Sequence, residues 1–166
     1  MITIFTSTIP FLISKAHAYH SQAPTLGMIT NMVQAQTVSE IENILQQTHY
    51  ADVVNEHRPS VNLSEFEIAL RRQYAKLLTT FTKAASPDVA KLLQAYSLLI
   101  EADNMRMILQ AVLKESVTDE IKQSIIPIGK YGMEYYERMM GTTTVEAALD
   151  FISHPALNKA AREALK

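Results

Sequence analysis

The sequence repeats part of itself at long range. Residues 37–45, TVSEIENIL, reappear 107 residues later as residues 144–152, TVEAALDFI. Upstream, residues 28–33 match residues 135–140 at the same offset, again with apolar side chains at corresponding places. A period of this length indicates a domain-sized unit and not a short solenoid repeat. A chain of 166 residues therefore holds one whole unit and roughly half of a second.

The apolar pattern is helical along most of the chain, because apolar side chains recur at steps of three and four residues. Several local motifs mark where these helices begin. Pro10 suits a first helical turn, Ser86-Pro87-Asp88 combines a cap with proline and an acid, and Thr118 caps a shorter segment. Capping boxes, in which Ser or Thr precedes Glu by three residues, occur as Thr37 with Glu40, Ser64 with Glu67, and Thr143 with Glu146.

These patterns predict the order of the elements. We expect helices at residues 10–19, 26–33, 37–48, 64–83, 86–100, 104–113, 131–140 and 156–166, with shorter ones opening at Thr118 and Thr143. Residues 49–61 are expected to form a loop, residues 101–103 a bend, and residues 125–129 a non-helical apolar connector. Residues 89–100 are apolar on more than one face, which is typical of a helix at the centre of a bundle. Only residues 2–9 carry a weak strand bias.

The predicted fold class is all-α, an irregular multi-helix bundle made of pseudo-repeats, one complete and one partial. Residues 1–130 form the first helical repeat with its connector, and residues 131–166 begin a second, incomplete repeat. The counterpart of the long helix at 64–83 would start near residue 171, past the last residue. We therefore expect exposed apolar surface near the C-terminal end, where self-association through the incomplete second repeat could cover it.

Composition excludes several classes of function. The chain has no cysteine, which removes a disulfide framework, a thiolate metal site and a cysteine nucleophile. Its net charge is −2, so no positive field favours nucleic acid. Its four glycines are not clustered, whereas a phosphate-cradling loop needs clustered glycine. The sequence also contains no apolar run long enough to span a bilayer.

The titratable residues do not form a recognisable catalytic or metal-binding pattern. His17 and His20 are three residues apart, but no Asp or Glu occurs before Glu40 to complete a metal site. We expect one of these histidines to be semi-buried and the other exposed. Of the acid pairs only Glu134 and Glu137 share a helix face, and no Glu-x-x-His element accompanies them. We predict no catalytic, cofactor-binding or metal-binding residues, no cofactor, and no enzyme activity.

Two surface features have more than one interpretation. Arg71, Arg72 and Lys76 form a small basic face, which is either a contact for a partner or a plain solvated face. Residues 1–18 resemble a secretory signal only loosely, because a basic leading region is missing and polar residues interrupt the apolar run. The structural interpretation is a first helix entered through Pro10.

The order of segments resembles the C subunit of the archaeal-type rotary ATPase, the family of the vacuolar-pump d subunit, and corresponds to its N-terminal part only. Four local motifs carry the resemblance. They are the capped helix ending in Thr48-His49-Tyr50, the Ala69-Leu70-Arg71-Arg72 core, the Ser86-Pro87 helix continuing through Glu101-Ala102-Asp103-Asn104, and the connector Ile126-Pro127-Ile128-Gly129-Lys130.

The resemblance implies a mechanical role. Family members are built from three helical pseudo-repeats that form a funnel on the cytoplasmic end of the membrane proteolipid ring. The funnel receives the foot of the central stalk in a proton- or ion-translocating ATPase. By resemblance, this chain is a non-catalytic coupling subunit, or a fragment of one, that is cytoplasmic, peripheral on the membrane and in membrane contact only through the ring. Its implied partners are the central-stalk subunits and the proteolipid ring.

Other functions stay open at this point. A free-standing helical adaptor related to the family would show the same low content of charged residues, 19%, and the same lack of an active-site motif. A secreted helical protein or an enzyme without a known motif are further alternatives. A genome neighbourhood without ATPase subunits would favour the adaptor, and a pocket joining titratable groups would favour the enzyme.

Overall fold

The structure, a computed structural model, describes residues 8–164, and every regular element within that range is a helix. The all-α prediction is therefore confirmed. The weak strand bias falls on residues 2–9. Residues 2–7 lie outside the described residues, whereas residues 8–9 belong to the first helix. Residues 165–166 of the predicted last helix also lie outside the described residues. The helices are α1 (Thr8–Ser21), α2 (Leu26–Gln34), α3 (Val38–Leu45), α4 (Ala51–Glu56), α5 (Leu63–Ala84), α6 (Pro87–Leu113), α7 (Asp119–Ser124), α8 (Met133–Met140), α9 (Val145–Asp150) and α10 (Pro155–Ala164).

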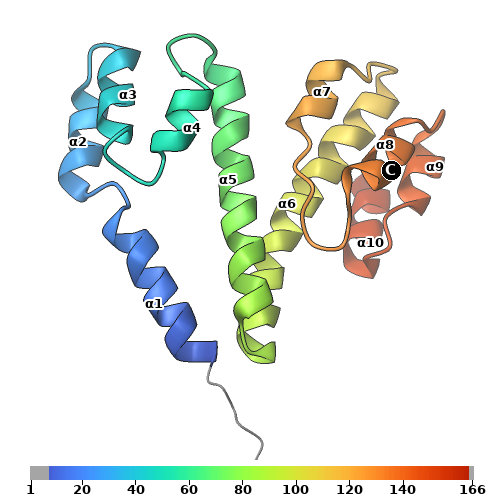
Figure 1. Cartoon of the computed structure of the whole chain (residues 1–166). Helices are drawn as coiled ribbons and strands as arrows, with labels where there is room; N and C mark the ends of the chain where they lie inside the picture. The colour runs from blue at the N-terminus through green and yellow to red at the C-terminus, as the bar shows by residue number, and fades with distance from the viewer. Residues whose placement is uncertain (1–7, 165–166) are drawn as a thin grey trace, which may run out of the picture. The chain divides into compact units, whose positions relative to one another are not determined.

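The chain divides into two compact units, residues 1–90 and residues 91–166, with the division in the first turn of α6. In the first unit α3 packs against both α2 and α4, while α1 and α4 pack on the long helix α5 (Figure 1). Leu45, Val54 and Phe66 form the buried centre of this unit, one each from α3, α4 and α5. The long helix α5 thus contacts α1 and α4 directly, whereas α3 packs on α4 and α2 packs on α3.

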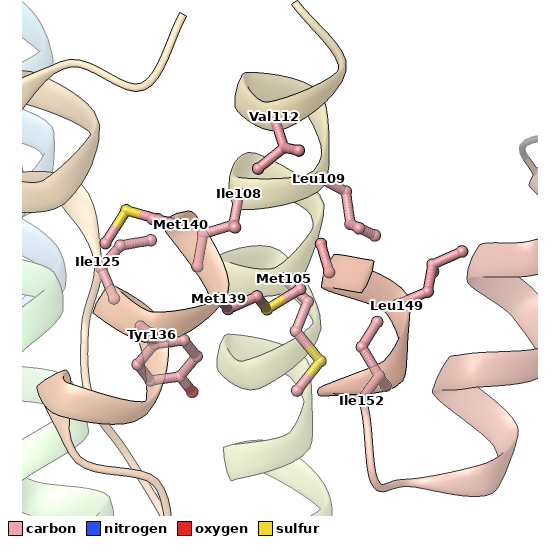
Figure 2. Packing of buried hydrophobic residues seen from close by; sticks show 11 residues of the cluster. Met105, Ile108, Leu109, Val112, Ile125, Tyr136, Met139, Met140, Leu149 and Ile152 are labelled. Carbon is pink, nitrogen blue, oxygen red and sulfur yellow. The ribbon is translucent and has the colours of Figure 1, made fainter. Parts of the chain in front are cut away.

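The second unit is built around the C-terminal half of α6. Figure 2 shows α6 side chains directed at α8 and α9, with the connector (residues 125–129) closing one side. The buried cluster consists of Met105, Ile108, Leu109, Val112, Ile125, Tyr136, Met139, Met140, Ala148, Leu149 and Ile152. Three methionines fill this core, as the adaptable shape of the methionine side chain allows.

The sequence repeat is also a structural repeat. Helices α2, α3 and α4 correspond at the 107-residue offset to α8, α9 and α10. The caps match closely: Thr37 (φ −132°, ψ 152°) and Thr144 (φ −135°, ψ 151°) each accept a hydrogen bond from the backbone N–H three residues on. The division into residues 1–130 and 131–166 remains a prediction, because the compact units reflect contacts and not the repeat.

The two copies of the repeat differ in what covers them. Met140 of α8 is buried in the second unit, in the cluster that includes the C-terminal half of α6. Its counterpart in α2, Val33, is 82% exposed, and Leu26 at the start of the same helix is 80% exposed. The apolar stripe of α2 therefore lacks the cover that α8 has.

Two elements differ from the sequence prediction. The predicted loop at residues 49–61 contains α4, a helix with no side-chain cap whose residue Val54 is fully buried. Packing on α5, which the local sequence does not reveal, stabilises this short helix. The predicted bend at residues 101–103 is also wrong, since α6 runs unbroken over 27 residues. No glycine or proline follows Pro87 in α6, so nothing in the backbone forces a break.

Two predicted caps are displaced and one predicted burial is wrong. The side chain of Asn62, and not that of Ser64, caps α5 by accepting from the N–H of Glu65 at 3.1 Å. Thr144, and not Thr143, caps α9. The expectation that residues 89–100 lie at the centre of a bundle fails as well, because Leu92 and Leu99 are 61% and 67% exposed. Burial in α6 is concentrated in its C-terminal half.

Candidate functional site

A buried polar contact in the second unit joins α6 to the connector. Asn104 is fully buried, and its side-chain amide donates to the carbonyl oxygen of Ile126 at 2.8 Å. Its Oδ1 atom accepts from the N–H of Ile126 at 3.1 Å. The connector is not helical and cannot satisfy these two backbone groups by itself, so the amide supplies the partners that a neighbouring strand would provide. Asn104 therefore acts as a latch that holds the connector on α6.

Gly129 ends the connector in a conformation that favours glycine. Its φ angle is +70°, in the left-handed region. A Cβ atom at this position would collide with Oε1 of Glu101. The left-handed φ is what favours glycine here, and the close approach shows that the carboxyl group of Glu101 lies directly against the connector.

Three titratable side chains near this latch favour their protonated forms. Burial raises the pKa of Glu101 from its ordinary value of 4.5. The nearby Lys130 and His154 act in the opposite direction and lower this pKa, but burial has the larger effect. Burial also raises the pKa of Tyr135 and of Tyr136 to about 12. The Tyr136 hydroxyl is buried and has no hydrogen-bond partner of ordinary geometry among the described residues. This environment favours packing and a fixed connector over proton transfer.

The raised pKa of Glu101 makes stability depend on pH. The folded state binds this proton more tightly than the unfolded state does, so the stabilising contribution is present at low pH. It is lost as pH rises through the folded-state pKa. We expect Glu101→Gln to be more resistant to urea than the wild type at pH 8 and to lose this advantage near pH 4. If the urea midpoints of Glu101→Gln and the wild type were equal at pH 8 and also at pH 4, the pKa of Glu101 would not be raised in the folded state.

Aromatic side chains surround the latch on the α8 side. The rings of Tyr131 and Tyr135 stack with centroids 4.1 Å apart, and Tyr136 meets Tyr135 edge to face at 5.3 Å. The Tyr135 hydroxyl donates to the carbonyl of Phe151, and the Tyr131 hydroxyl pairs with Ser153. These contacts tie the start of α8 to the end of α9.

The first unit has its own buried acid. Glu42 of α3 is 3% exposed, and its carboxylate accepts from the N–H of Ser60 at 2.7 Å. Arg58 lies 3.7 Å from the other carboxylate oxygen. Hydrogen bonding from the side chain of Ser60, and then from its backbone N–H, is the main reason that the pKa of Glu42 is lowered, and Arg58 adds to it. Glu42 therefore clamps the loop after α4 onto α3.

Glu42→Gln tests this clamp. The lowered pKa stabilises the fold above the ordinary pKa of the carboxyl group, and this contribution disappears as pH falls through the folded-state pKa. We expect a lower thermal midpoint than the wild type at pH 7 and a vanishing difference in acid. Glu56→Gln, at a side chain that is 78% exposed, is the matched control and should leave the midpoint unchanged. A Glu42→Gln variant as stable as this control would show that the clamp does not contribute.

The histidines contribute to local structure. His17 and His20 are both exposed, so the prediction that one is semi-buried is wrong. His57 pairs with Glu65 at 3.1 Å, and His154 accepts from the N–H of Leu157 at the start of α10. Within residues 8–164, no group of three or more His, Cys, Asp or Glu side chains is placed to hold a metal ion.

Surface features complete the candidate sites. The basic side chains Arg71, Arg72 and Lys76 are exposed on α5, as expected both for a partner contact and for a plain solvated face.

In the second unit an apolar groove of about 400 Å³ lies between α6 and α10. Leu113, on the wall of this groove, is 59% exposed. The groove corresponds to the apolar surface expected near the C-terminal end.

Sequence reasoning missed the two buried polar clamps. Glu42 and Asn104 both lie on helices whose apolar neighbours were expected to form the buried face. Their partners are backbone groups 18 and 22 residues further along the chain, so no local pattern identifies them. The only available signal for Asn104 was its presence in one of the four motifs that resemble the C subunit family, and its partner Ile126 lies in another.

The sequence matches the family described as ATP synthase (C/AC39) subunit over residues 12–166. It is similar to the C subunit of the A-type ATP synthase of Pyrococcus furiosus, with 30% identity over 117 residues, or 69% of this chain and 32% of that protein. The corresponding C subunits of Pyrococcus horikoshii and Thermococcus kodakarensis are 28% and 30% identical over 71% and 67% of this chain. The chain spans about a third of the length of these curated relatives.

No solved structure matches this chain, so the likeness to these relatives is one of sequence. Across residues 8–164, none of the helices combines the length and the apolar character that crossing a bilayer requires.

Proposed function

The chain belongs to the ATP synthase C/AC39 subunit family, and on that premise we propose that it is a non-catalytic coupling subunit, or part of one, in a rotary ATPase. In this role it links the central stalk to the membrane proteolipid ring from the cytoplasmic side, and it meets the membrane only through the ring. The observation that carries the proposal is the family match over residues 12–166, nearly the whole chain.

The packing is compatible with a part that transmits force. Helices α5 and α6, of 22 and 27 residues, extend about 33 Å and about 40 Å at 1.5 Å per residue. Short helices pack on each of them, and close packing has low compressibility, so a load is passed on and not absorbed. The Asn104 latch and the Glu42 clamp hold the non-helical segments against these long helices and the short ones beside them. Hydrogen bonds that fix the non-helical segments in this way support a mechanical role.

The arrangement of titratable groups supports a non-catalytic role. Four groups have shifted pKa values, and each contacts the connector, a loop or another of the four. They are Glu42, Glu101, Tyr135 and Tyr136. The groove between α6 and α10 is lined by apolar side chains apart from Arg106 and Gln110. General acid–base chemistry needs a positioned titratable group beside a substrate pocket, and these groups are placed elsewhere.

Co-purification from the organism that makes the chain tests the proposal. An affinity-tagged chain expressed at its native level should recover central-stalk and proteolipid subunits from detergent-solubilised membranes, as identified by mass spectrometry. A tagged unrelated helical protein of similar charge serves as the control. Recovery of the tagged chain with no ATPase subunit, in repeated preparations that retain an intact ATPase, would overturn the proposal.

A free-standing helical adaptor related to the family is the second candidate. The genes beside its own distinguish the two. Neighbouring genes for other ATPase subunits favour the coupling role, whereas a neighbourhood without any of them favours the adaptor.

A further inference from the structure

The hydroxyl of Tyr136 is buried without a partner in the part of the chain that the structure describes. Tyr136 of α8 is 0% exposed, and no described residue forms a hydrogen bond with its hydroxyl. The ring packs in the buried cluster of the second unit, and the hydroxyl lies at the edge of that cluster (Figure 2). A buried polar group without a partner destabilises the folded state. Such a group in a native core therefore indicates a bound water or ion beside it.

A second polar group near this hydroxyl also lacks a hydrogen bond. Glu101 of α6 is 9% exposed, and its carboxyl group forms no hydrogen bond within residues 8–164. Burial is the main reason that the pKa of Tyr136 is raised to about 12, and the charge of Glu101 adds to it, so the two side chains lie close together. The hydroxyl can donate and the carboxylate can accept, but they do not bond to each other directly.

The side chain of Asn104 borders the same place. It lowers the pKa of Tyr136, which shows that it lies near the hydroxyl, although the two do not meet with hydrogen-bond geometry. The Oδ1 atom of Asn104 accepts one hydrogen bond, from the N–H of Ile126 at 3.1 Å. An amide oxygen has two lone pairs, so Oδ1 can accept one more. Tyr136, Glu101 and Asn104 thus supply one donor and two acceptors in one small region of the second unit.

We propose that this region binds a single buried water molecule that joins the three side chains. The Tyr136 hydroxyl donates to the water oxygen, and the water donates one hydrogen to the Glu101 carboxylate and the other to Oδ1 of Asn104. Buried waters in proteins typically make about three hydrogen bonds to polar groups that have no other partner. The water ties α8 to α6 and to the connector latch. This inference goes beyond the proposed coupling function and does not depend on it.

Charge favours water over a metal cation at this place. Burial raises the pKa of Glu101, and the positive charges of Lys130 and His154 lie close enough to act in the opposite direction. A cation would be repelled by these groups and would compete with them for one carboxylate. Across residues 8–164, no set of three or more His, Cys, Asp or Glu side chains could hold a metal. Water is neutral and both donates and accepts, as one donor and two acceptors require.

Urea unfolding of Tyr136→Phe in the full chain tests the proposal. The variant removes the donor to the water, so the equilibrium constant for folding should fall by about fivefold. A hydroxyl without any partner predicts the opposite result, because phenylalanine then removes a buried polar group and loses no hydrogen bond. A variant at least as stable as the wild type therefore overturns the proposal. Tyr96→Phe, at a position of α6 that is 49% exposed, is the matched control and should leave the constant unchanged.

A double-mutant cycle tests whether the hydroxyl acts through Glu101. Leucine at position 101 fills a similar volume but cannot accept a hydrogen bond. In a Glu101→Leu background, Tyr136→Phe should therefore lower the folding constant by no more than about twofold. A loss of about fivefold in both backgrounds would mean that Glu101 takes no part, and it would overturn the bridge.

A high-resolution crystal structure of the full chain identifies the bound group directly. We expect one ordered water within hydrogen-bond distance of both the Tyr136 hydroxyl and the Glu101 carboxylate, and its loss in Tyr136→Phe. A direct hydrogen bond from Tyr136 to Asn104, with no water beside it, would overturn the proposal. Crystals soaked in rubidium chloride should show no anomalous peak at this place. Such a peak would identify a cation site and would also overturn the proposal.

Discussion

Asn104→Leu is expected to lower the free energy of unfolding by about 3 kcal/mol, since it leaves two buried backbone groups of Ile126 without partners, at about 1–3 kcal/mol each. Leucine has a branched shape like that of asparagine and is larger, so a cavity does not explain the loss. Asn104 is fully buried, and water cannot easily replace the amide. Urea unfolding, followed by circular dichroism, measures the difference.

Two further variants isolate the cause of this loss. Gln94→Leu, at an exposed position of the same helix, should change stability by no more than about 0.5 kcal/mol. Asn104→Asp keeps an acceptor for the N–H of Ile126 but presents an oxygen to its carbonyl, so it should be less stable than the wild type at pH 7. If Asn104→Leu unfolds within about 0.5 kcal/mol of the wild type, the latch does not stabilise the connector.

Gly129→Ala is expected to cost about 2 kcal/mol, mainly because alanine at a φ of +70° is disfavoured by about 1–2 kcal/mol. The remainder comes from the close approach of the new Cβ to the Glu101 carboxylate, which must move. Because Glu101 is buried, its movement also disturbs the packing around the connector.

A double-mutant cycle separates the two contributions. In a Glu101→Ala background the contact is absent, so Gly129→Ala should cost less there than in the wild type, and the difference measures the contact. Gly132→Ala is the matched control, because its φ is −82° and a Cβ there meets nothing within 4 Å. Gly132 is the N-cap of α8, where alanine is less favourable than glycine, so we expect a loss of about 0.5 kcal/mol, well below that of Gly129→Ala. Equal losses for Gly129→Ala and Gly132→Ala would contradict the role of the left-handed turn.

Local signals predicted much of the fold correctly. The features predicted correctly depend on interactions within a few residues. They are the caps Thr37 and Thr118, the start of α6 at Pro87 and the non-helical connector. The repeat was also visible in the sequence, since residues that occupy equivalent places in equivalent helices have similar apolar character. These features follow from capping and periodicity, which act over short distances.

What the sequence did not reveal depends on distant partners. Helix α4 is short and has no capping side chain, and it exists because Val54 packs under α5. Glu42 and its repeat counterpart Leu149 are both buried, although glutamate is charged and leucine is apolar. The difference lies in Ser60, whose backbone N–H satisfies the carboxylate. No local pattern shows that such a partner will be present.

The candidate site shows the same limit. The Asn104 segment and the Ile126 connector are separate motifs in the sequence, and the structure places them in direct contact. Spacing along the chain gave no reason to join them. The expected apolar surface near the C-terminal end needed only the phase of the repeat, which is why it was predictable.

Cross-linking mass spectrometry on native membranes tests the coupling role most directly. The tagged chain, treated with a lysine-reactive reagent before solubilisation, should give cross-links both to a central-stalk subunit and to the proteolipid ring or the segments beside it. Cross-links to neither, in a preparation where other ATPase subunits cross-link to one another, would contradict the proposal that this chain joins the stalk to the ring.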